Sequence, residues 1–182
     1  MNSIELFRRL HQHRMWANSR LLETSSKLSW EQLQRPLTIG QGSVWKTLVH
    51  LQAAEYVWLE TLLGDTCPLF PGDEVGKLPG NQLREGAVAD FNELENRWQE
   101  LDQRWQAYLV DLAENSLDEQ VHKVNSRTGQ SFGTSRADVL LHVCTHAQYT
   151  TAQSINMLRQ LGVKSLPDVM LITLARSESD QT

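Results

Sequence analysis

The chain has 182 residues, a formal net charge of −5 and 40% hydrophobic residues, a size and composition typical of one globular domain. No apolar run approaches the roughly 20 residues of a membrane-spanning helix, and no cluster of lysines and arginines is suited to nucleic-acid phosphates. Residues 1–9 do not resemble a signal peptide, and the two cysteines, Cys67 and Cys144, fall in segments of different predicted structure. We therefore expect a soluble, cytoplasmic protein with reduced thiols, and neither nucleic acid nor a membrane as partner.

The first part of the chain predicts a long helix followed by a connection. Apolar residues at helical spacing indicate a helix over residues 4–26, although His11 and Arg14 interrupt its apolar stripe. Residues 30–42 contain one proline and two glycines, and we expect them to form a connecting segment.

A second helix is predicted over residues 44–63, with Ser43 as its N-cap and Gly64 as its stop. Residues 67–81 contain three prolines and three glycines. Because neither a helix nor a central strand accommodates that density, we expect a long surface loop there.

The clearest periodicity of the sequence predicts the third helix. From residue 87 to residue 112, apolar side chains recur at alternating steps of four and three, which is typical of the buried seam of a bundle helix. Residues 117–133 then predict a short β-hairpin, with its turn near residues 127–130.

A fourth long helix is predicted over residues 139–161, after a capping box that begins at Ser135. A last short helix is expected over residues 167–174. The fold class expected from these elements is all-α: one four-helix-bundle domain over residues 1–176, and a disordered tail over residues 177–182.

Three histidines are placed so that they could share one metal ion. His142 and His146 are four residues apart on the predicted fourth helix, so their imidazoles lie on one helix face. His50 lies midway along the predicted second helix, and bundles build metal sites from inward side chains of facing helices. Three histidines with water leave a coordination position open for chemistry. The alternative is that all three are partly buried helix residues with structural hydrogen bonds.

Other polar residues are expected to be structural. We expect His11 and His13, near the chain start, and His122, in the hairpin, at the surface. Glu55 lies off the histidine face of its helix and is expected to form a structural ion pair or helix contact. Cys144 points away from the neighbouring histidines and is expected to be a buried, inert thiol.

Several short segments resemble helices of the DinB-like superfamily. They are MWAN at 15–18, GSV at 42–44, LVHL at 48–51, EYVWL at 55–59, LLHVCTHAQY at 140–149 and MLRQLG at 157–162. They occur in the expected order, and the resemblance extends over nearly the whole chain. The resemblance implies a four-helix bundle, often homodimeric, with a divalent metal held by one histidine of the second helix and two of the fourth.

The resemblance also places the ligands and shows one departure. His50 matches the ligand of the second helix. Family members commonly have histidines at three successive four-residue steps of the fourth helix, and the latter two are the usual ligands. Here His142 and His146 match the first two steps, and Thr150 occupies the third. Because a threonine hydroxyl is a poor transition-metal ligand, either His142 turns in to complete a three-histidine site, or His50 and His146 bind an ion with water.

The function that this resemblance implies is a divalent-metal-dependent enzyme of the thiol-dependent transferase or hydrolase type, acting on a small molecule. Zinc or nickel is the expected metal, and a low-molecular-weight thiol is a further candidate cofactor. His50, His142 and His146 are the expected ligands, and no residue stands out as a general base. The alternative is a non-catalytic, metal-poor bundle that binds a small molecule or partner in the stress response of a DNA-damage-inducible family.

Overall fold

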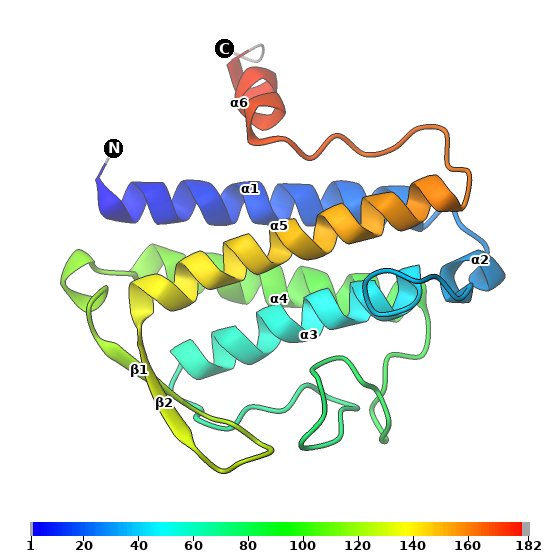
Figure 1. Ribbon diagram of the computed structural model, residues 1–182. Coiled ribbons are helices and arrows are strands. Elements are labelled where there is room, and N and C mark those ends of the chain that lie inside the picture. Colours follow the sequence, from blue (N-terminus) through cyan, green and yellow to red (C-terminus); the bar gives the residue numbers. More distant parts are fainter. Residues whose placement is uncertain (1, 180–182) are drawn as a thin grey trace.

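The computed structural model describes residues 2–179 and places four long helices alongside one another (Figure 1). They are α1 (Ser3–Ser25), α3 (Val44–Leu62), α4 (Phe91–Asp111) and α5 (Arg136–Gln160). The shorter elements are α2 (Trp30–Gln34), the 3-10 helix η1 (Glu114–Ser116), β1 (Gln120–Val124), β2 (Ser131–Ser135) and α6 (Leu171–Ser179). The predicted bundle with a hairpin before its last long helix and a short C-terminal helix is confirmed. None of the helices within residues 2–179 combines the length and apolar character needed to cross a membrane.

Two of the long helices, α3 and α5, begin at the caps that the sequence indicates. The hydroxyl of Ser43 accepts the backbone N–H of Lys46 at the start of α3, and Ser135 accepts that of Asp138 at the start of α5. The two strands before α5 pair antiparallel, from Gln120 opposite Ser135 to Val124 opposite Ser131.

Several of the predicted boundaries differ from the structure, including the start of α5, which is Arg136 rather than residue 139. Residues 30–34, expected to be part of a connection, form α2, because Ser29 and Gln32 make a capping box that starts a short helix. The third long helix begins at Phe91 rather than residue 87, since Asp90 is its cap.

The C-terminal helix lies later than expected, at Leu171–Ser179 rather than residues 167–174. An extended segment runs back along α1 before it (Figure 1), and the carbonyl of Val169 on this segment accepts a hydrogen bond from His13 at 2.8 Å. Helix α6 therefore includes residues 177–179 of the expected tail, and residues 180–182 lie outside the described part of the chain.

A buried polar layer divides the core of the bundle. One apolar cluster contains Trp98 and the other Trp105, the two largest fully buried side chains. Along α1, the buried polar residues His11, Arg14 and Asn18 lie between Phe7 of one cluster and Leu21 of the other. Glu55 of α3 joins this layer through Arg14 and Asn18. The surface position expected for His11 and His13 is therefore wrong, because both are buried, whereas His122 is exposed as predicted.

Candidate metal centre and its supporting loop

The structure brings the three predicted histidines into one cluster between α3 and α5. The ring centroids of His50 and His146 are 5.2 Å apart, with the ring planes at 72°. His142, one helical turn before His146, has its ring 5.8 Å from that of His146. It also lies edge-on to Trp58 at 5.2 Å. His146 is therefore the middle member of the cluster, between one histidine of its own helix and one of the facing helix.

The loop after α3 fixes the tautomer of His50. Nδ1 of His50 lies 2.8 Å from the carbonyl oxygen of Pro79, and because a carbonyl can only accept, Nδ1 carries the hydrogen. The lone pair of Nε2 is then free to bind an ion. This is the hydrogen bond that commonly orients metal-binding histidines.

Asp73 holds this part of the loop in place. Its buried carboxylate accepts the backbone N–H groups of Gly80 at 2.6 Å and Gln82 at 3.0 Å, and the side-chain amide of Gln82 at 2.8 Å. Gly80 itself packs so closely that a Cβ would lie 2.6 Å from the Cα of His50. The backbone next to His50 is thus positioned by a buried acid and by a glycine contact.

Burial keeps the histidines of α5 neutral. It lowers the pKa of His146 to about 4, and the charges of His50 and His142 lower it further in the same direction. Burial also lowers the pKa of His142. Near neutral pH both rings are therefore uncharged, which is the form that binds a metal.

Two of the three histidines, His50 and His146, lie at a separation that suits a shared metal ion. Zinc–nitrogen bonds are about 2.0–2.1 Å long and a ring nitrogen lies about 1.1 Å from its centroid, so two imidazoles on one tetrahedral ion have centroids about 5 Å apart. The separation of His50 and His146 matches that value. Within residues 2–179, no group of three or more His, Cys, Asp or Glu side chains is arranged to hold an ion. A third protein ligand therefore requires His142 to turn away from Trp58.

Comparison with known proteins gives the family. The family model described as "DinB family" matches residues 1–180. The chain belongs to the DinB family.

Among solved structures, YfiT from Bacillus subtilis is similar to this DinB-family chain with a TM-score of 0.64 and 19% sequence identity. The match covers 89% of this chain and 91% of YfiT. YfiT is described as "a probable metal-dependent hydrolase with an unusual four-helix bundle topology". At this identity the similarity shows the shared fold. A search of curated proteins finds no match.

The DinB-family bundle places Thr150 and Cys144 in its interior. Thr150, which occupies the third histidine step, is only 2% exposed. Cys144 is buried as predicted, and burial raises the pKa of its thiol to about 12. An un-ionised, enclosed thiol is a poor nucleophile, so Cys144 is a packing residue.

Glu55 forms the predicted ion pair, within a larger polar network. Its carboxylate pairs with Arg14 and accepts a 2.8 Å hydrogen bond from the side-chain amide of Asn18. Asp102 of α4 lies 3.9 Å from Arg14, and the guanidinium of Arg14 stacks 4.9 Å from the centroid of Trp105. The network joins α1, α3 and α4 at the level of the polar layer.

The sequence analysis missed the residues that support the histidines. Pro79, Gly80 and Asp73 lie in a segment whose prolines and glycines indicated only a loop. Nothing in the local pattern shows that this loop folds back onto His50, because the contact joins residues about thirty positions apart. The polar layer could have been predicted from the sequence of α1, because His11, Arg14 and Asn18 occupy successive positions of its apolar stripe.

Proposed function

We propose that this protein is a divalent-metal-dependent enzyme of the hydrolase or thiol-dependent transferase type, with His50, His142 and His146 as ligands of zinc or nickel. The observation that carries the proposal is the facing pair His50 and His146, 5.2 Å apart, with Nδ1 of His50 bonded to a backbone carbonyl. Membership of the DinB family and the description of YfiT as a probable metal-dependent hydrolase support it.

Each histidine has a distinct part in this proposal. His50 presents Nε2 from a ring whose orientation the loop fixes, and His146 presents a neutral imidazole from α5. His142, more exposed than the other two, turns in as the third ligand or leaves its position to water. A bound divalent ion with an open position supplies Lewis acidity and lowers the pKa of a bound water or thiol.

Metal content tests the proposal. Elemental analysis of tag-free protein is expected to give about one zinc or nickel ion per chain. His50→Ala and His146→Ala are expected to lose the ion, and His142→Ala to weaken its binding. His122→Ala, which changes an exposed histidine outside the cluster, is the matched control and should keep it. Full metal content in the His50→Ala and His146→Ala proteins would place the ion elsewhere.

The second candidate function is a non-catalytic, metal-poor bundle that binds a small molecule or partner. Two observations favour it: Thr150 occupies the third histidine step, and no three side chains in residues 2–179 are arranged to hold an ion. Thr150→His separates the candidates. An ion that appears only in this variant would mean that the natural chain has lost its metal, whereas an ion in both proteins supports the enzyme.

The proposal extends to assembly and location. We expect a homodimer, from the resemblance to the family, and light scattering at a few concentrations would measure it. Cys67 and Cys144 are both free thiols, which supports a reducing compartment such as the cytoplasm. The net charge of −5 supports a small-molecule substrate rather than nucleic acid.

A further inference from the structure

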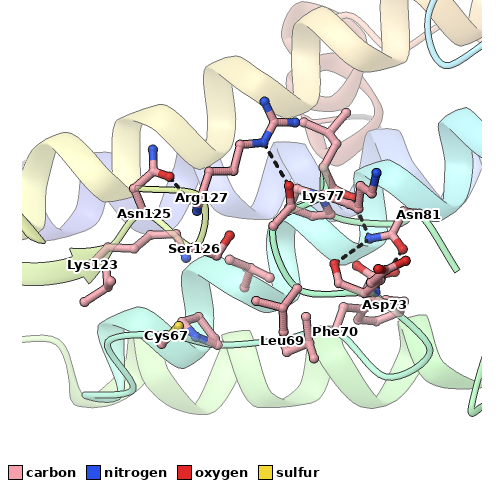
Figure 2. A pocket seen from close by; sticks show the side chains of 18 residues that line it. Cys67, Leu69, Phe70, Asp73, Lys77, Asn81, Lys123, Asn125, Ser126 and Arg127 are labelled. Carbon is pink, nitrogen blue, oxygen red and sulfur yellow. Dashed lines mark hydrogen bonds between the residues drawn. The ribbon is translucent and has the colours of Figure 1, made fainter. Parts of the chain in front are cut away.

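A pocket of about 340 Å³ lies next to the histidine cluster, between the loop of residues 67–81 and residues 123–127, which form the end of β1 and the start of the turn after it (Figure 2). Its volume is at the lower end of the range of small-molecule sites. Pro79 belongs to its lining and also accepts the hydrogen bond from His50. Pro79 therefore joins the pocket to the Nδ1 side of the His50 ring, while Nε2 is the nitrogen that is free to bind an ion.

Lys123 is a second connection, besides Pro79, between the pocket and the histidine cluster. Its side chain is half-buried, and its Nζ lies 5.6 Å from the ring centroid of Trp58. The same ring also lies 5.2 Å from the ring of His142. A small molecule bound at Lys123 would thus be separated from His142, a proposed metal ligand, by the ring of Trp58.

Three cationic side chains line this pocket in a protein that is acidic overall: Lys77, Lys123 and Arg127. Among residues 2–179, no carboxylate oxygen forms an ion pair with any of the three, whereas Arg14 and Arg136, outside the pocket, both have carboxylate partners. Burial lowers the pKa of Lys123, so its ammonium is partly stripped of water. The charge of Asp65 opposes this shift without forming an ion pair with Lys123, and an anion in the pocket would supply a counter-charge in direct contact.

Arg127 is oriented to bind a carboxylate. Its Nε donates a 2.9 Å hydrogen bond to the carbonyl of Gly76, across from the β1–β2 turn to the loop (Figure 2). This bond leaves both terminal Nη groups of the guanidinium available. Two parallel N–H groups match the two oxygens of a carboxylate, which makes the bidentate pair specific as well as strong.

The two acids of the lining leave it with one more cationic than anionic side chain. The carboxylate of Asp73 is occupied by the N–H groups of Gly80 and Gln82, so it acts within the loop. Glu74 is the remaining negative group. The rest of the wall includes the apolar side chains of Val57, Leu69 and Phe70, which suit an uncharged body.

We infer that this pocket binds the substrate, and that the substrate is a small organic acid whose carboxylate contacts Arg127 and Lys123 while its apolar body packs on Leu69 and Phe70. That the ligand is the substrate rests on the proposed function. Its binding is a separate property, which can be measured on metal-free protein.

The test compares a carboxylate with the uncharged amide of the same size. The probes are 3-phenylpropionate and 3-phenylpropionamide, titrated into protein in a chelating, low-salt buffer and followed by 1H–15N NMR. The acid is expected to bind about tenfold more tightly than the amide, since one charge-assisted hydrogen-bond pair supplies about that factor. The largest shifts are expected at residues 76–79 and 123–127.

Two variants test whether Arg127 and Lys123 contact the carboxylate of the acid. Arg127→Ala and Lys123→Gln are each expected to weaken binding of the acid about tenfold and leave binding of the amide unchanged. Lys164→Gln, which changes an exposed lysine outside the pocket, is the matched control and should bind both probes as the natural protein does. The spectra of the variants report at the same time whether each remains folded.

The outcomes separate this inference from the proposed function. If the acid binds no better than the amide, or shifts the NMR resonances of residues outside the pocket, the inference is wrong even when the protein contains its metal ion. If the acid binds preferentially, but the protein purified without a chelator contains no metal ion, the pocket stands and the metalloenzyme proposal fails. His50→Ala is expected to keep the preference for the acid.

Discussion

Glu55 is the residue whose environment departs most from that of an ordinary acid. It is 1% exposed, between α1 and α4, with Arg14 and Asn18 as its polar partners. Burial raises its pKa to about 7, and the charge of Asp102 acts in the same direction, against Arg14 and Asn18. Burial raises the pKa of Asp102 as well, to about 6. Burial thus raises the pKa values of both acids in this layer toward neutral pH.

Glu55→Gln is expected to change how stability depends on pH. The folded protein holds the Glu55 proton with a pKa of about 7, against an ordinary value of 4.5. Its stabilising effect is thus fully present below pH 4.5 and is lost as the pH rises through 7. The free energy of unfolding of the natural protein, relative to the variant, should rise by on the order of 3 kcal/mol from pH 8 to pH 5.

Urea unfolding at pH 8, 6.5 and 5 measures this difference. Buried histidines such as His11, whose pKa burial and the charge of Arg14 lower, oppose the trend, but they are present in both proteins and cancel. Glu23→Gln, at an exposed acid of α1, is the control and should show no such pH dependence. A relative stability that stays constant or rises toward pH 8 would contradict the raised pKa.

Element by element, the sequence predicts the helices better than the loop between them. Steps of three and four among Leu94, Trp98, Leu101 and Trp105 indicate α4 directly, because helical periodicity is local. The contact between Gly80 and His50 is not local, and no spacing rule reaches it. The histidines of the candidate site could thus be predicted, while the loop that orients one of them could not.

Gly80→Ala tests the loop as a support for His50. Gly80 has φ +82°, and its Cβ would meet the backbone of α3, so the variant combines left-handed strain with displacement of the loop. Gly162 has φ +83° with open space around it, and Gly162→Ala carries the strain alone. We expect a loss in free energy of unfolding of about 1 kcal/mol for Gly162→Ala and about 2–4 kcal/mol for Gly80→Ala.

The same pair of variants separates support of the site from stability. If the Pro79 carbonyl orients His50, Gly80→Ala should also bind zinc about tenfold more weakly, as loss of an outer hydrogen bond to a ligand commonly does. Gly162→Ala should bind zinc as the natural protein does. Equal zinc affinity in the two variants would mean that the loop has no part in metal binding.

At the scale of the whole molecule, the cluster of histidines joins two helices of the core. His50 belongs to α3 and His146 to α5, and these helices also contribute to both apolar clusters on either side of the polar layer. An ion held by both helices therefore binds the folded bundle and not the unfolded chain. Metal binding should appear as stability of the entire domain.

Thermal unfolding with added zinc is expected to show this link. At a free zinc concentration one hundred times the dissociation constant, the folded state gains about 2.7 kcal/mol, which for a chain of this length raises Tm by about 5–10 °C. His50→Ala should lose the rise, and His122→Ala should keep it, because its histidine is exposed on β1. An equal rise in the His50→Ala protein would show that zinc stabilises the bundle at another place, since that variant lacks the ligand that joins α3 to α5.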